Sequence, residues 1–227
     1  MKKIILFATA ALLLFANAAM ADSIAGKVGI TARGGASYIF NSEWTNEAIT
    51  EFGDTLNKDI KPSIGWAAGG GLMYGITDNL AVTFDVIYLQ ADLKASAENM
   101  ELIIGQGKTI DFSLGAQWRF MPKSRFVPYV GAGFDVLLNK VDLGSVLKQW
   151  SEDEGVTMDV ANTYGGHLSA GVDFFFTPNI AFNAEIRGLY STKGDVALKV
   201  PGYSDVIAAK YNPTNISAFM GIRFFFP

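Results

Sequence analysis

The sequence predicts an all-β fold, an eight-stranded antiparallel up-and-down transmembrane β-barrel. Three observations predict it: apolar residues recur at every second position, short and long connections alternate along the chain, and aromatic residues mark the ends of the expected strands. Successive side chains of a strand point to opposite faces, so a period of two indicates strands that separate two environments.

The beginning of the chain is predicted to be a signal peptide rather than part of the fold. Lys2-Lys3 is followed by an apolar run and then by Ala19-Met20-Ala21, which has the small-residue pattern of a cleavage site. The apolar run is too short to span a membrane as a helix. We therefore expect residues 1–21 to be removed on export and residues 22–227 to form a single barrel domain.

Composition excludes several classes of function. The chain has no cysteine and a single histidine, which excludes disulfides, thiolate catalysis and a histidine-based metal cluster, and we expect neither a metal nor a cofactor. Without its first two lysines the chain carries 16 basic and 22 acidic side chains, a net charge of −6. A basic footprint for nucleic acid is therefore absent, and we expect no nucleic-acid partner.

Eight segments show the period of two. The clearest is 109–120, in which every second residue from Ile110 to Phe120 is apolar and the alternate face is polar or glycine. None of the apolar faces carries a charge, as expected of lipid contact, because Arg or Lys near the bilayer midplane costs about 2–4 kcal/mol. The other seven segments are 27–38, 63–74, 80–88, 129–139, 164–176, 180–190 and 216–226.

The connections favour a membrane barrel over a soluble barrel of the lipocalin type, which also shows alternation. Those at 77–79, 121–124 and 177–179 are short and contain turn residues. The alternate connections are long, and they are 41–62, 91–108, 141–162 and 193–213. Short periplasmic turns with long extracellular loops are typical of outer-membrane barrels.

Aromatic residues form two bands, as at the two interfaces of a membrane. The band at the short-turn ends consists of Tyr74, Trp118, Phe120, Phe174, Phe176, Phe224 and Phe226. The band at the other ends consists of Tyr38, Trp66, Tyr88, Tyr164 and Tyr190. We therefore predict that the chain lies in the outer membrane of a Gram-negative cell, with outer-membrane lipid and lipopolysaccharide as partners.

Strand parity also predicts a polar network lining the lumen. Charges of both signs occur in similar number, and an eight-stranded barrel is just wide enough to be filled by side chains. Buried charges persist only when they are paired, so we expect ion pairs that close the lumen; a polar gate on a narrow path is the alternative. The predicted members are Arg33, Asp85, Asp111, Arg119, Asp135, His167, Asp173, Glu185, Arg187 and Arg223.

One group of residues could be catalytic. His167-Leu168-Ser169 lies on one segment and Glu185 on its hairpin partner, which suggests a Ser/His/Glu hydrolase. The His-x-Ser pattern resembles that of PagL-type lipid A deacylases. Parity points these side chains into the lumen, however, and Ala170 stands where that family carries a polar residue. We therefore expect no enzyme, with a deacylase as a minor alternative.

The order of motifs resembles the OmpW family of outer-membrane barrels. The residues that carry the resemblance are Pro128-Tyr129-Val130-Gly131-Ala132-Gly133, the preceding Ala116-Gln117-Trp118-Arg119-Phe120, the hairpin from Gly171 to Asn183, and the final 217–224. The resemblance implies a narrow barrel associated with small hydrophobic molecules, present as a monomer or small homo-oligomer. It predicts a channel or receptor that assists the passage of such molecules. A non-conducting structural or adhesion barrel acting through its extracellular loops is the alternative.

Overall fold

The computed structural model describes residues 23–40, 42–44, 56–62, 64–97, 100–143, 157–199 and 206–227. The predicted signal peptide at 1–21 lies outside the described residues. No helix among the described residues is long and apolar enough to cross a membrane.

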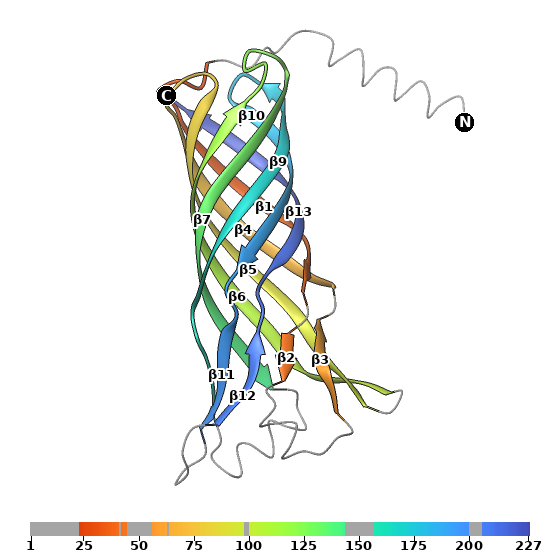
Figure 1. Ribbon diagram of the computed structural model, residues 1–227. Coiled ribbons are helices and arrows are strands. Elements are labelled where there is room, and N and C mark those ends of the chain that lie inside the picture. Colours follow the sequence, from red (N-terminus) through yellow and green to blue (C-terminus); the bar gives the residue numbers. More distant parts are fainter. Residues whose placement is uncertain are drawn as a thin grey trace, which may run out of the picture.

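Eight strands form a closed antiparallel wall (Figure 1). In order around the barrel they are β1 (Val28–Ile39), β4 (Ile64–Gly75), β5 (Leu80–Ala97), β6 (Met100–Arg119), β7 (Phe126–Leu143), β9 (Thr163–Thr177), β10 (Ile180–Ser191) and β13 (Asn215–Phe226). The wall closes because β1 pairs with both β13 and β4. Each predicted segment falls on one of these strands, which confirms the eight-stranded antiparallel barrel.

Short turns join wall strands at one end of the barrel, and local side chains hold them. In the turn from β4 to β5, the Thr77 hydroxyl accepts hydrogen bonds from the backbone N–H of Asn79 at 3.2 Å and of Leu80 at 3.0 Å. The Asn79 side chain then donates to the backbone carbonyl of Arg119 at 2.8 Å, which ties this turn to the end of β6. We call this end of the barrel the short-turn end and the opposite one the outer end.

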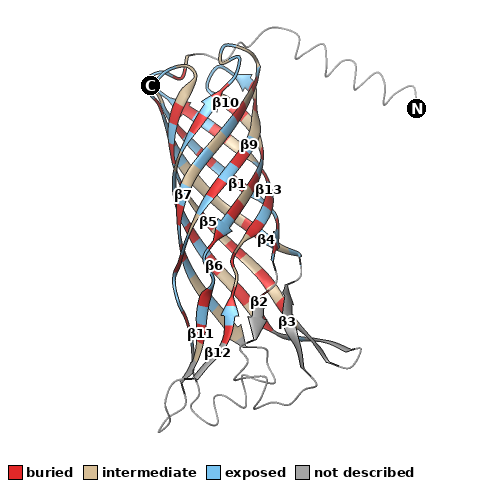
Figure 2. Ribbon diagram, viewed as in Figure 1, coloured by how far each residue is buried: buried red, intermediate tan, exposed pale blue. Residues whose placement is uncertain are grey.

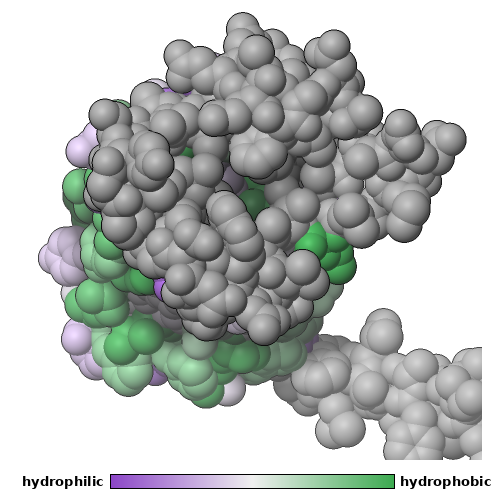
Figure 3. Space-filling view, turned by 90° about the horizontal axis from the view of Figure 1, so that it is seen from below, coloured by the Kyte–Doolittle hydropathy of each residue, from purple (hydrophilic) through white to green (hydrophobic). Residues whose placement is uncertain are grey.

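The wall alternates between a lipid-facing surface and a lumen-facing surface (Figure 2). On β6, for example, Leu114 is 61% exposed while the neighbouring Ser113 is buried. Seen from the outer end, hydrophobic residues gather on the flank of the barrel (Figure 3). The barrel is therefore apolar outside and polar inside, the reverse of a soluble barrel, as a lipid environment requires.

The long connections were predicted as loops, and the structure shows that several of them contain additional strands. β5, β6 and β7 run on beyond the wall at the outer end. There β5 pairs with β3 (Leu56–Pro62), and the sheet continues through β2 (Ser42–Trp44), β12 (Val206–Tyr211), β11 (Gly194–Lys199) and β8 (Thr157–Val160) (Figure 1). We call this part the outer extension. These strands lack a clear apolar period because pairing with neighbouring strands, rather than lipid contact, supports them.

A group of charged residues on the outer surface marks the limit of the lipid-facing band. Lys108 on β6 lies directly opposite Lys140 on β7, and both contact Asp142, at 2.6 and 3.0 Å. From Trp118 to Lys108 the strand advances ten residues. At about 3.3 Å per residue and a tilt of about 40°, this is roughly 25 Å, the height of the apolar band of such barrels. Lys108 therefore lies at the outer interface.

This group makes a pH-dependent contribution to stability. Hydrogen bonds from Lys108 and then Lys140 hold the pKa of Asp142 below its ordinary value. A lowered pKa in the folded state gives stability that is present above the unfolded pKa and lost as the pH falls through the folded one. We expect Asp142→Asn to lower the urea midpoint slightly near neutral pH, with the difference fading below the ordinary aspartate value of about 4. Urea titrations in lipid vesicles across this range check it, and an undiminished difference in acid would contradict it.

Candidate functional site

The charged residues of the lumen form three layers along the barrel axis. The layer nearest the short-turn end is centred on Asp173 of β9, which is fully buried. Arg119 and Arg223 each place a guanidinium nitrogen 2.7 Å from its Oδ2, and Asn183 donates to its Oδ1 at 2.8 Å. Arg223 also donates to the Thr31 hydroxyl at 2.8 Å. Two guanidinium groups therefore face a single carboxylate in this short-turn layer.

The middle layer has the opposite balance. Arg33 of β1 contacts Glu185 of β10 at 2.7 Å and Asp85 of β5 at 2.8 Å. The second oxygen of Glu185 accepts a hydrogen bond from the Tyr129 hydroxyl at 2.8 Å. Two carboxylates therefore face a single guanidinium group here.

The outer layer contains the only histidine of the chain. Arg187 of β10 contacts Asp111 of β6 at 2.9 Å and also Asp135 of β7. His167 of β9 places Nδ1 2.9 and 3.0 Å from the two carboxylate oxygens of Asp135. Two carboxylates here face one guanidinium and one imidazole.

All ten side chains predicted to line the lumen are buried there, and the three layers bring them together. The lumen also uses neutral residues outside the predicted network, notably Tyr129 and Asn183. Asn183 donates to the Tyr129 hydroxyl at 2.8 Å, which links the short-turn and middle layers. Alternation along β7 and β10 places both residues on the lumen face, but the predicted network included only charged residues and the histidine.

The catalytic alternative finds little support in this geometry. Ser169 and His167 both face the lumen, but no hydrogen bond joins them in the described part of the chain. Glu185 is held by Arg33 and Tyr129 in the middle layer, while Asp135 is the carboxylate on His167. The structure therefore does not link the serine, histidine and glutamate by hydrogen bonds, as a hydrolase requires.

Apolar clusters lie on both sides of the charged layers. The short-turn cluster consists of Ile24, Met73, Ala81, Val127, Phe175, Ala181 and Phe225. Arg119 of the short-turn layer lies over the ring of Phe225 in this cluster, 5.7 Å from the ring centre. The cluster in the outer extension consists of Leu93, Val160, Val196, Ala209 and Tyr211, with Val141 against it. A third cluster, Ala67, Ile87, Leu89 and Phe219, lies beside the charged layers themselves, where Arg33 lies over the ring of Phe219.

The Tyr211 hydroxyl joins the outer cluster to the polar part of the lumen. It lies 3.1 Å from the Thr109 hydroxyl, which in turn lies 3.0 Å from Asn139. Burial raises the pKa of Tyr211 to about 12, so the phenol stays neutral at physiological pH. The outer cluster is therefore uncharged.

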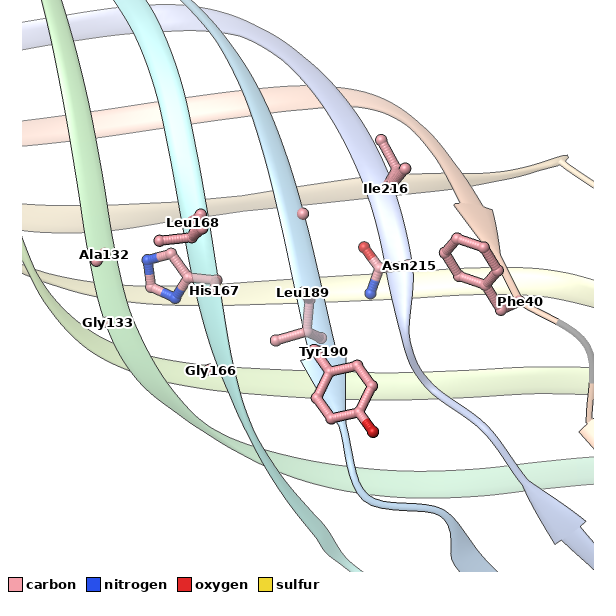
Figure 4. A pocket seen from close by; sticks show the side chains of 11 residues that line it. Phe40, Ala132, Gly133, Gly166, His167, Leu168, Leu189, Tyr190, Asn215 and Ile216 are labelled. Carbon is pink, nitrogen blue, oxygen red and sulfur yellow. The ribbon is translucent and has the colours of Figure 1, made fainter.

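A pocket of about 560 Å³ lies in the wall near the outer layer (Figure 4). Its lining residues come from both sides of the wall. The lumen-facing ones include His167, Leu189 and Asn215, and the lipid-facing ones include Leu168, Tyr190 and Ile216. Gly188 also lines it, and a Cβ atom there would meet nothing within 4 Å. We call this space the wall pocket; residues from both faces of the wall line it.

The described residues contain no group of three His, Asp or Glu side chains arranged to hold a metal ion. This statement concerns the described ranges alone.

Comparisons with known proteins agree with this architecture. The family model described as outer membrane protein beta-barrel domain matches residues 7–224. No curated protein sequence is significantly similar to the chain. The crystal structure of the outer membrane protein OprG from Pseudomonas aeruginosa is 18% identical, with a TM-score of 0.67, and the match covers 89% of this chain and 96% of OprG.

Two further solved structures share the fold. The outer membrane protein AlkL, studied in DMPC bilayers, is 17% identical with a TM-score of 0.54, and the match covers 92% of this chain and 94% of AlkL. Neisserial surface protein A is 18% identical with a TM-score of 0.50, covering 89% and 98%. At these identities the likeness concerns the fold. The family and the fold agree with the resemblance to the OmpW family.

Proposed function

The chain belongs to the family of outer membrane protein beta-barrel domains, and on that basis we propose that it assists the passage of small, mainly hydrophobic molecules across the outer membrane. It lies in the outer membrane of a Gram-negative cell. The proposed role is that of a receptor or narrow channel with a side exit, rather than a water-filled pore.

The wall pocket is the observation that carries this proposal. A hydrophobic solute that followed the barrel axis would have to part the three charged layers, which would leave buried charges without partners. The wall pocket lies beside the outer layer and is lined on one side by lipid-facing residues such as Leu168 and Tyr190. A solute leaving through it would move into the bilayer without crossing the charged lumen.

Filling the wall pocket tests the proposal. Gly188 faces lipid on β10, and a side chain there meets open space, so we expect Gly188→Leu to fold normally and to occlude the pocket. Gly34→Leu is the matched control, since Gly34 faces lipid on β1 and its Cβ would make only an ordinary contact at 3.8 Å.

The measurement is uptake of a radiolabelled hydrocarbon by cells lacking the wild-type protein and producing each variant. We expect Gly188→Leu to slow uptake by about tenfold, equivalent to about 1.4 kcal/mol of lost binding, and Gly34→Leu to match wild type. Equal uptake by both variants would contradict a route through the wall pocket.

A non-conducting structural or adhesion barrel is the second candidate, and the occupied lumen is the observation that favours it. In that case deletion of the protein leaves uptake unchanged, and the refolded barrel is silent in a planar bilayer. Partners such as lipopolysaccharide, and assembly as a monomer or small homo-oligomer, remain predictions.

A further inference from the structure

His167 is the only basic side chain among the described residues that line the wall pocket. Asp135 holds its ring in one orientation, because a carboxylate can only accept hydrogen bonds and Nδ1 must therefore donate. The other ring nitrogen, Nε2, has no hydrogen-bond partner among the described residues. A carboxylate that fixes one nitrogen of a histidine leaves the second one available to a ligand.

Charged side chains of several strands face the lumen around His167. Asp135 faces it from β7, Arg187 from β10 and Asp111 from β6, with Asp85 of β5 beyond them. The described charges that face the lumen from β1, β4 and β13 are those of Arg33 and Arg223, and both are paired in other layers.

The three layers together contain five carboxylates and four guanidinium groups. One buried negative charge therefore lacks a guanidinium partner, and an uncompensated buried charge is strongly unfavourable. A ligand group that adds negative charge beside Asp111 and Asp135 is therefore disfavoured. A hydroxyl group is uncharged and can hydrogen-bond with Nε2 either as donor or as acceptor.

We propose that the wall pocket binds an uncharged amphipathic alcohol whose hydroxyl group hydrogen-bonds with Nε2 of His167. Its hydrocarbon part lies against the apolar lining, which includes Phe40, Leu168 and Ile216. The inference rests on the proposed function, since it names the class of molecule that uses the same pocket.

Alternative ligand chemistries fit this site less well. A carboxylate would add a negative charge beside Asp111 and Asp135. An ammonium group would have to leave water for a pocket whose lining is mostly apolar. A plain hydrocarbon would fill the pocket but leave Nε2 without a partner, and sites built around a hydrogen bond discriminate against analogues that lack it. An alcohol with a medium-length chain satisfies both parts, and the pocket volume is in the usual range for small ligands.

The single histidine makes a direct test possible. Protein without a histidine tag, labelled with isotopic nitrogen in histidine, gives NMR signals from His167 alone. We expect 1-octanol to shift the Nε2 signal. Nonane, which is similar in length but has no oxygen, should leave that signal in place. An Nε2 signal that does not change at saturating 1-octanol would overturn the inference.

Uptake measurements separate this inference from the proposed function. Wild type should prefer 1-octanol to nonane by about tenfold, since a lost hydrogen bond is of that order. His167→Leu should abolish the preference, whereas His167→Gln, which keeps a hydrogen-bonding group, should retain part of it and guards against a folding defect.

The two ideas fail in different ways. If wild type takes up both molecules equally and His167→Leu changes nothing, the ligand assignment is wrong while passage through the wall stands. If the protein supports uptake of neither molecule, the proposed function is wrong, and the Nε2 signal decides whether the pocket still binds 1-octanol.

Discussion

Asp173→Asn is expected to destabilise the barrel by about 3–5 kcal/mol, the usual cost of removing one partner of a buried ion pair. Asp173 is fully buried and supplies the carboxylate contacted by both Arg119 and Arg223. Asparagine has nearly the same shape, so the change removes the negative charge and leaves two guanidinium groups together without it. The wall strands β6 and β13, which carry these arginines, would then lose their ion pairs with β9.

Equilibrium unfolding in guanidinium chloride, with the protein in lipid vesicles and followed by tryptophan fluorescence, measures this loss. Asp195→Asn is the matched control, because Asp195 is about half exposed and its nearest described cation, Lys210, lies 4.0 Å away. An exposed pair of this kind contributes roughly 0–1 kcal/mol. Similar losses of unfolding free energy in the two variants would show that the buried ion pairs of Asp173 stabilise the barrel no more than an exposed ion pair does.

Leu114→Arg is expected to cost about 2–4 kcal/mol, because it places a charge on the lipid-facing surface near the middle of the bilayer. Leu114 is 61% exposed on β6 and lies directly opposite Phe134, which also faces lipid. An arginine there must leave water for hydrocarbon, and no acidic side chain of the described lipid-facing band lies beside it. The same unfolding assay measures the change.

Ile103→Arg is the control on the same strand. Ile103 is 60% exposed but lies in the outer extension, beyond Lys108 and the outer interface. An arginine near or outside the interface costs about 0–1 kcal/mol. If the two substitutions were equally costly, the lipid-facing band would have to extend further along β6 than the position of Lys108 indicates.

Local patterns in the sequence are enough to predict the wall of the barrel and the environment of its two faces. Alternation along a segment such as 109–120 is a local property, because the pleat of a strand sends Asp111 to one face and Phe112 to the other whatever the rest of the chain does. Turn chemistry at positions such as Thr77 and Asn79 is equally local. The eight strands and the charged residues of the lumen therefore follow from the order of the amino acids alone.

The partners that each lumen residue meets depend instead on the tertiary structure. Arg33 contacts Glu185 across a sequence separation of 152 residues, and Arg187 contacts Asp111 and Asp135 rather than Asp173. Such pairings depend on the stagger between strands as the barrel closes, which no single segment encodes. The outer extension was missed for a related reason, since its strands are stabilised by pairing with one another.

The wall pocket is also a product of tertiary structure. It depends on lumen-facing and lipid-facing residues of β7, β9, β10 and β13 lying around one gap, with Gly188 leaving space that another residue would fill. In the sequence these residues are scattered between Phe40 and Ile216. Local alternation determines the face on which each side chain lies, and the closure of the barrel determines its neighbours.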